Sequence, residues 1–404
     1  MKTVFKLVMF FCVCSACTNS VMQKDVVEKA FRFAEVQLRE AICHVDSLSD
    51  AAFRKNVNTN LVSPRTINED GSLLLVPSRD WTSGFFPGEL WYMYEYTGDD
   101  FWKEEARRFT ARIENQKING GTHDMGFKMY CSFGNGYRLT RDSAYRDILL
   151  ESAATLATRY KPSVGCIRSW DHNQDKWQCP VIIDNMLNLE LLYWAFKESR
   201  DSLYYQVATR HAYTTMRNHF RKDYSSYHVV DYDTITGIVL HKHTHQGWNH
   251  ESSWARGQAW GLYGYTMCYR ETGIKDFLLQ AEHIANYIFK VADMPEDLIS
   301  YWDMKAPDIP NEPRDASAAA VMACALYELS IYSSDRADEY KKWADKIIHS
   351  LVSGYRAGLG EDYGFLLLHS TGARNFERDV PLVYADYYFL EALLKKSKVE
   401  MLKE

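Results

Sequence analysis

About twelve segments with helical periodicity follow one another along the 404 residues, and no Pro- or Ser-rich linker separates them. Apolar residues recur at helical spacing within them, as Leu187, Leu191 and Trp194 do. The segments cover roughly residues 24–50, 86–97, 100–115, 142–159, 184–198, 202–220, 254–271, 275–292, 315–332, 336–353 and 382–396, with one more near 125–134. Strand signals are few. We therefore predict an all-α chain that closes into a toroid of six helical hairpins, the (α/α)6 barrel. A solenoid of helical repeats is the alternative, although the chain contains no repeat of fixed period.

The first residues have the pattern of an export signal. Residues 1–6 give a short basic start, and residues 7–14 form an apolar run that is too short to span a membrane. The Cys14-Ser-Ala-Cys17 tetrad resembles a lipoprotein cleavage box, although Leu usually stands where this chain has Cys14. We therefore expect residues 1–16 to be a lipoprotein-type signal peptide and residues 17–404 to form one catalytic domain. The mature protein would be periplasmic and attached to the membrane only through a lipidated Cys17, with plain secretion as the alternative.

Charge and cysteine content exclude several classes of partner. The formal net charge of −6 argues against a nucleic-acid partner, which would need a basic face. Six cysteines follow Cys17, and their spacing fits no zinc pattern. In an exported chain Cys166 and Cys179 could form a disulfide, and buried free thiols are the interpretation for the others. We expect neither a cofactor nor a metal.

Residues 248–261 are unusually rich in groups that bind sugars. They contain three tryptophans (Trp248, Trp254 and Trp260) together with Arg256 and Gln258. Indole faces pack against sugar rings, and a guanidinium group binds a carboxylate through two hydrogen bonds. Arg256 and Trp260 are four residues apart and share a helical face. The segment predicts an enzyme that acts on an acidic sugar, whereas the structural alternative is an interhelical arginine among core tryptophans.

Two aspartates stand at the starts of helical patterns. The ordinary role of such a residue is to cap the helix. However, Asp184 follows the apolar residues 181–183, and Asp124 follows His123, a second titratable group. A general acid must keep its proton near neutral pH, which a helix N-terminus opposes and which burial or a neighbouring carboxylate favours. If Asp124 and Asp184 face each other, one stays ionised and raises the pKa of the other.

Histidines concentrate in residues 228–250. Those at positions 241, 243 and 245 alternate and could hold a metal from one face of a strand, but no acidic ligand is interleaved with them. Contact with an anionic sugar is the preferred interpretation for the group. For His241 and His243, hydrogen bonding to loop backbone is an equal alternative.

Six motifs in order resemble the unsaturated glucuronyl hydrolases, glycoside hydrolase family 88. The resemblance extends from about Asp80 to Leu394. The motifs are WTSGFFPG at residues 81–88, HDMGF at 123–127, DNMLN at 184–188, QG at 246–247, SWARGQAW at 253–260 and YADYYFLEAL at 384–393.

This resemblance implies the (α/α)6 fold and an activity on oligosaccharides left by polysaccharide lyases, which carry a C4–C5 unsaturated uronate at the non-reducing end. The family's chemistry is hydration of that vinyl ether, so the rules for direct displacement at the anomeric carbon do not apply. The resemblance implies that Asp184 is the general acid/base and that Asp124 is the partner that keeps it protonated.

The resemblance also implies a set of substrate contacts. Arg256 and Gln246 would contact the uronate, with Trp254 and Trp260 beside it, His228 near the reaction centre and Trp81 stacking on a sugar. His123 in the HDMGF motif is a further candidate for substrate binding. Trp170 matches a loop aromatic residue loosely. Residues 369–378 depart from the pattern in which some relatives accommodate sulfate. Ser370 and Arg374 are the candidates for that role here, and preference for a sulfated substrate is left open.

Two other functions remain as alternatives. An unsaturated rhamnogalacturonyl hydrolase acting on pectin fragments shares the barrel, but its arginine segment typically reads RGNGW where this chain has RGQAW at residues 256–260. A non-catalytic glycan-binding lipoprotein would need Arg256 and the tryptophans, yet it would not need paired acids in dry surroundings.

Overall fold

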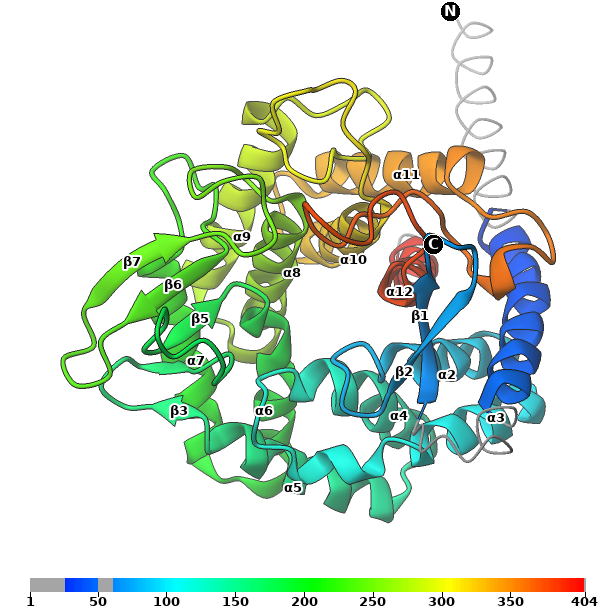
Figure 1. Ribbon diagram of the computed structural model, residues 1–404, viewed down its shortest axis with the longest axis horizontal. Helices are drawn as coiled ribbons and strands as arrows, with labels where there is room; N and C mark the ends of the chain where they lie inside the picture. Colours follow the sequence, from blue (N-terminus) through cyan, green and yellow to red (C-terminus); the bar gives the residue numbers. More distant parts are fainter. Residues whose placement is uncertain (1–25, 50–60, 403–404) are drawn as a thin grey trace, which may run out of the picture.

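The computed structural model describes residues 26–49 and 61–402, and helices dominate it (Figure 1). Residues 26–49 are helical. The longer helices that follow are α2 (Phe85–Thr97), α3 (Asp100–Ala111), α5 (Ser143–Ala157), α6 (Asn185–Ser199), α7 (Ser202–Asn218), α8 (Ala255–Thr272), α9 (Lys275–Asn286), α10 (Ala316–Tyr332), α11 (Ala337–Gly354) and α12 (Val383–Met401). The segment near 125–134 is the π-helix η2 (Gly126–Gly134), continued by α4 (Asn135–Thr140), and a second π-helical turn, η3 (Tyr287–Val291), extends α9. Short 3-10 turns are η1 (Glu114–Ile118) and η4 (Asp362–Gly364). The expected helices are confirmed with small shifts of their ends. The predicted signal peptide and Cys17 lie outside the described residues.

The inner helices of the described chain close into a ring. Contacts run from α2 to η2, then to α6, α8, α10 and α12, and α12 returns to α2. Each inner helix also packs against an outer one, as α10 does against α11 and α6 against α7. The helical residues 26–49 join the outer layer, where Gln37 donates to the carbonyl of Phe365. Because the ring closes, the structure is the predicted (α/α)6 barrel and not an open solenoid.

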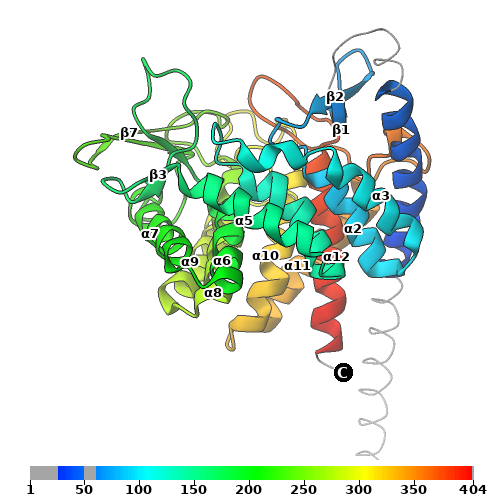
Figure 2. The same ribbon diagram turned by 90° about the horizontal axis from the view of Figure 1, so that it is seen from below.

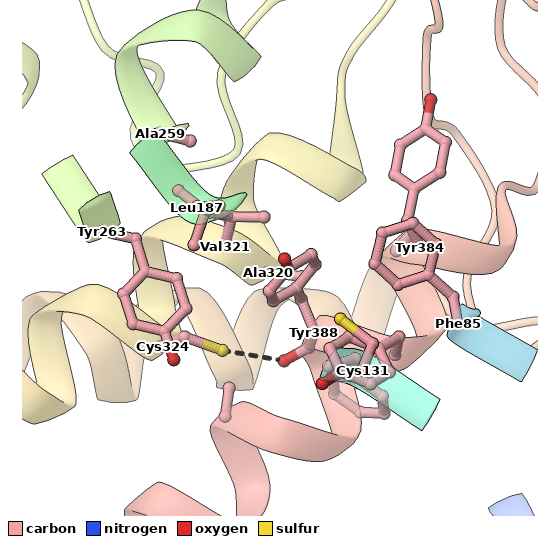
Figure 3. Close-up of a cluster of buried hydrophobic side chains, with 14 of the residues drawn as sticks. Phe85, Cys131, Leu187, Ala259, Tyr263, Ala320, Val321, Cys324, Tyr384 and Tyr388 are labelled. Atoms are coloured by element: carbon pink, nitrogen blue, oxygen red, sulfur yellow. Dashed lines mark hydrogen bonds between the residues drawn. The ribbon is translucent and has the colours of Figure 1, made fainter. Parts of the chain in front are cut away.

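The two layers differ in which residues they bury. In the inner helix α10 every residue from Ala316 to Leu329 is buried, whereas the outer helix α11 buries one stripe that includes Ala344, Ile348 and Leu351. Small residues let the inner helices approach closely: a Cβ atom on Gly264 of α8 would lie 2.4 Å from the Cβ of Met186 on α6. Figure 3 shows how side chains from all parts of the inner ring meet in the barrel interior.

Short strands, which the helical periodicity did not predict, lie at one end of the barrel (Figure 2). β1 (Leu61–Ile67) and β2 (Leu73–Pro77) form an antiparallel hairpin, and β3 (Tyr160–Lys161) pairs with β4 (Cys166–Ile167). β5 (Pro180–Ile182), β6 (Val229–Tyr232) and β7 (Val239–His243) form an antiparallel sheet in the order β5-β6-β7. These strands have two to seven residues each, too few for a clear alternating pattern. We call this end of the barrel the mouth.

Two further expectations concern cysteines and membranes. Cys166 and Cys179 are free, buried thiols in a small apolar cluster beside β5 and β6. Within the described part of the chain, no helix has the length and apolar character needed to cross a bilayer.

Candidate active site

A cavity of about 350 Å³ opens at the mouth, where the inner helices begin. Six of the predicted site residues border it: Trp81, His123, Asp124, Asp184, Gln246 and Arg256. Helix N-termini carry partial positive charge, so their convergence at this end favours an anionic ligand. His245, for which contact with an anionic sugar was the preferred interpretation, and the loosely matched Trp170 also border the cavity. Sequence reasoning missed other lining residues: Arg65, Thr122, Ser169, His172, Phe376, Glu377 and Tyr384.

Asp184 occupies the N-cap position of α6, yet its side chain accepts no hydrogen bond from the helix. Asp99, Asp142 and Asp201 do cap their helices in this way. Asp184 is only 7 % exposed, and within the described residues its Oδ2 has no hydrogen-bond partner. Burial raises the pKa of Asp184 to about 7; the guanidinium of Arg256 opposes this rise in pKa and the charge of Asp124 adds to it. The side chain can therefore hold a proton near neutral pH.

His228 faces Asp184 because β5 and β6 pair beside it. Ile182 is paired with Val229, which places the Nε2 of His228 3.6 Å from Asp184 Oδ2. The other ring nitrogen, Nδ1, accepts the backbone N–H groups of His245 and Gln246, each at 3.1 Å. A nitrogen that accepts hydrogen bonds carries no proton, so the ring is neutral with its proton on Nε2. Burial agrees with this, since it lowers the pKa of His228 well below the usual value.

Asp124 sits just before η2 and is held by its neighbours. The hydroxyl of Thr122 donates to Asp124 Oδ2 at 2.7 Å, and His123 Nε2 lies 3.3 Å from Oδ1. Burial lowers the pKa of His123 and lowers that of the buried Lys128 to about 8, while the charge of Asp124 raises both pKa values. The structure thus places the two aspartates on the same cavity, as their predicted coupling requires.

Arg256 is completely buried and already has internal partners. It donates to Asp315 Oδ2 at 3.0 Å and to the carbonyls of Thr371 and Gly372 at 2.7 and 2.5 Å. Gln246 Nε2 also donates to the Gly372 carbonyl, at 2.9 Å. Arg256 therefore does join helices, as the structural alternative held, while it also borders the cavity. Its contact with a uronate remains a prediction.

The tryptophans have different positions. Trp81 borders the cavity, with its ring centroid 4.9 Å from that of Tyr384. Trp254 lies behind the cavity lining, 4.5 Å from the ring of His228 and 4.5 Å from the guanidinium carbon of Arg256. Trp260 is fully buried against Phe127 and Tyr388. Of the three, only Trp81 presents surface to the cavity, and Trp254 and Trp260 support the residues that do.

Ser370 also lies away from the cavity. It is fully buried, and its backbone pairs with that of Val380 at 2.9 Å in both directions. This pairing leaves its hydroxyl in the interior without a partner among the described residues. Arg374 is instead stacked over Trp248, with 4.0 Å between the guanidinium carbon and the ring centroid. A role for either residue in binding sulfate stays a prediction.

The alternating histidines do not assemble a metal site. The rings of His241 and His243 lie 4.3 Å apart, and those of His243 and His250 lie 4.1 Å apart. His241 Nε2 is 3.6 Å from Asp231 Oδ2. Across residues 26–49 and 61–402, however, no group of three or more His, Cys, Asp or Glu side chains has an arrangement that could hold a metal ion.

Comparison with known proteins agrees with this geometry. The family model for Glycosyl Hydrolase Family 88 matches residues 59–392. An unsaturated glucuronyl hydrolase of Formosa agariphila is 50 % identical over 328 residues, covering 80 % of this chain and 82 % of the relative. An unsaturated chondroitin disaccharide hydrolase of Streptococcus pneumoniae is 32 % identical over 342 residues, covering 82 % and 85 %. A solved unsaturated glucuronyl hydrolase specific for heparin has a TM-score of 0.87 and 48 % identity, covering 93 % of this chain and 98 % of that one. With its closed helical ring and its pair of mouth aspartates, the chain belongs to glycoside hydrolase family 88.

Proposed function

We propose that the protein releases the non-reducing-end 4,5-unsaturated uronic acid from oligosaccharides that glycosaminoglycan lyases produce. The observation that carries this proposal is Asp184, a buried acid whose pKa is raised to about 7 in a cavity that also holds Asp124. A vinyl ether is hydrated by protonation at carbon, which needs an acid that is still protonated near neutral pH. The names of the relatives support the same substrate class.

In the proposed reaction Asp184 gives its proton to C4 of the unsaturated uronate. Water then adds at C5 and returns a proton to the Asp184 carboxylate. The hemiketal formed at C5 opens and expels the remaining sugar, so one water is consumed and the acid is regenerated. The Nε2–H group of the neutral His228 ring faces Oδ2 of Asp184. It can donate a hydrogen bond to the Asp184 carboxylate once that acid has given up its proton.

The two alternative functions have weaker support. The relatives described above are named glucuronyl or chondroitin disaccharide hydrolases, which favours a glycosaminoglycan fragment over a pectin fragment. A purely glycan-binding role gives no reason for a buried acid whose pKa is raised to about 7.

The test uses the chromophore of the substrate. Unsaturated disaccharides from chondroitin, hyaluronan and heparin lyases absorb near 235 nm, and hydration of the double bond removes that absorbance. We expect the purified protein to abolish the signal of at least one of them and to release a free sugar in equal amount. A panel in which no disaccharide loses absorbance would exclude the proposed activity.

We further propose that the protein is exported and lipid-anchored at Cys17. The support is the basic start, the short apolar run and the small residues before Cys17. A labelled fatty acid should be incorporated covalently into the wild-type protein and should not be incorporated into a Cys17→Ser variant. Equal labelling of both would refute the anchor.

A further inference from the structure

Arg65 on β1 holds two carboxylates that lie far apart in the sequence. Its Nε and Nη2 donate to Oε1 and Oε2 of Glu377 at 2.5 and 3.1 Å. Its Nη1 donates to Oδ2 and Oδ1 of Asp80 at 3.0 and 3.2 Å. The side chains of Arg65, Asp80 and Glu377 are 15, 20 and 11 % exposed, so solvent weakens these bonds little. The guanidinium bridges two separate segments of the mouth.

Each of these segments carries an aromatic residue that borders the cavity. Asp80 precedes Trp81, and its Oδ1 also accepts the backbone N–H and the hydroxyl of Thr82, at 2.9 and 2.7 Å. The Asp80 carboxylate therefore fixes the short turn of residues 80–82 that contains Trp81. Glu377 follows Phe376, and Trp81, Phe376, Glu377 and Arg65 all border the cavity.

The second segment is a short hairpin, residues 370–380, which we call the flap. Its other edge is held by Arg256 and Gln246, which donate to the Thr371 and Gly372 carbonyls. Glu377 also packs tightly against the flap itself: a Cβ atom on Gly372 would lie 2.4 Å from Glu377 Oε2. On the side facing β1, Thr66 Oγ1 donates to the carbonyl of Pro381 just after the flap, at 2.7 Å, and the ion pair of Arg65 with Glu377 joins the flap itself to the Trp81 segment.

We propose that Arg65 is a positioning residue that sets the separation between the Trp81 wall and the Phe376 flap of the substrate cavity. This inference rests on the proposed function. A planar guanidinium can bind two carboxylates in fixed directions, whereas a lysine ammonium is a point charge on a flexible stem and holds neither in one geometry. Arg65 acts on the substrate through Asp80 and Glu377, because their oxygens occupy its Nε, Nη1 and Nη2.

Direct binding of the uronate by Arg65 predicts the opposite behaviour. In that case Glu377 competes with the substrate carboxylate, so Glu377→Gln would lower KM. If Arg65 positions the walls, Glu377→Gln loosens the flap and raises KM. The sign of this change therefore separates the two roles without removing the arginine.

The experiment compares Glu377→Gln, Arg65→Lys and the double variant on whichever of the chondroitin, hyaluronan and heparin lyase disaccharides the wild type consumes fastest. We expect KM to rise about tenfold in each single variant, with kcat reduced less than KM is raised, because misplaced binding groups weaken substrate positioning while Asp184 is untouched. The double variant should be no worse than Arg65→Lys alone, because both substitutions break the same link between Arg65 and Glu377. The pH at which kcat falls should not move.

The matched control is Arg108→Gln, which removes an arginine that pairs with Asp46 and Glu105 in the outer layer. It should leave KM unchanged. The inference is overturned if Glu377→Gln lowers KM, or if both single variants lose thermal stability while KM stays that of the wild type. Should Arg65→Lys fail to fold, Glu377→Gln decides alone. A wild type that consumes none of the three disaccharides would instead count against the proposed function.

Discussion

Two cavities of the described barrel have nearly equal volume: about 350 Å³ at the mouth and about 340 Å³ in a second cavity, which α2, η2, α4, α6, α8 and α12 line and which we call the lower cavity. Aromatic and apolar side chains from the inner ring separate them, among them Phe127, Trp260 and Tyr388; Figure 3 shows part of this layer. Both cavities are lined by carboxylates, cations and aromatic rings. The two cavities differ in whether the charged and polar side chains around them have hydrogen-bond or ion-pair partners.

In the lower cavity the charged groups have partners. Arg270 is bound to Glu190, Glu271 and Glu328, and Lys395 is bound to Glu328 and Glu391. Among the described residues that line it, no buried side-chain nitrogen or oxygen lacks a hydrogen-bond partner. Such a network is complete without a ligand.

At the mouth, several buried polar atoms lack a hydrogen-bond partner among the described residues. Asp184 Oδ2, His228 Nε2 and His123 Nδ1 have no hydrogen-bond partner in the described part of the chain. An unmatched buried polar group is costly, so it points to a group that a ligand satisfies.

A raised pKa alone does not distinguish the two cavities. Burial raises the pKa of Glu190 to about 6 in the lower one, as it raises that of Asp184 to about 7 at the mouth. Glu190, however, is paired with Arg270, whereas Asp184 Oδ2 has no hydrogen-bond partner among the described residues. Between these two cavities, the missing hydrogen-bond partner of Asp184 within the described chain, and not the raised pKa, distinguishes the acid at the mouth from Glu190.

The largest expected effect is a loss of kcat when Asp184, the acid without a hydrogen-bond partner on Oδ2 among the described residues, can no longer donate a proton. Asp184→Asn should lower kcat by about a thousandfold or more, because it removes the proton donor while keeping the shape of the side chain. Binding of the disaccharide, followed by tryptophan fluorescence, should persist. The control is Asp201→Asn, a cap of α7 at the surface, which should keep full activity. Turnover by Asp184→Asn close to the wild-type rate would remove Asp184 from the catalytic role.

The second-largest effect should be a lower free energy of unfolding, with KM and kcat unchanged, when Arg270 in the lower cavity is replaced. Arg270→Met leaves Glu190, Glu271 and Glu328 without their shared cation, and we expect a loss of about 3 kcal/mol in the free energy of unfolding. Because Arg270 lines the lower cavity and not the cavity at the mouth, KM and kcat should stay unchanged at temperatures where the variant is folded. Urea denaturation and the 235 nm assay measure the two quantities.

The matched control for Arg270→Met is Lys398→Met, which removes an exposed partner of Glu95 at the rim of the same cavity. It should cost less than about 1 kcal/mol. If Arg270→Met changed KM while its stability were preserved, the distinction between the two cavities would fail.

The smallest effect concerns pH. Asp184 must be protonated to act, and its folded pKa of about 7 lies above the usual 3.8, so kcat should be full below pH 7 and fall as pH rises through that value. The charge of Asp124 raises this pKa, so the residual activity of Asp124→Asn should begin to fall at a lower pH. A pH–rate profile of both proteins measures the shift. An identical alkaline limb in the two would show that the aspartates are not coupled.

Much of the scaffold could be predicted from local patterns. Periodicity of three to four residues marked the helices, and their number without linkers indicated a closed barrel. The short strands escaped because two to seven residues carry little periodic signal, although β5 and β6 are what place His228 beside Asp184.

The sequence predicted the two acids of the site better than it predicted which side chains face the cavity. The motifs marked Asp124 and Asp184, and both border the cavity. The tryptophans of residues 248–261 were expected to hold the sugar, but Trp254 and Trp260 lie behind the lining. A sequence shows that indoles are close together, and only packing decides which face of each remains open.

By itself, the sequence determined the helices and the family and placed Asp124 and Asp184 in motifs of that family, because each of these signals is a short pattern of residues within a few positions of one another. The tertiary structure decided which groups are paired. Glu377 meets Arg65 across 312 positions, and Arg256 meets the flap carbonyls across 115 and 116 positions. The neutral state of His228 and the raised pKa of Asp184 likewise exist only in the fold, because burial and distant backbone donors create them once the ring has closed.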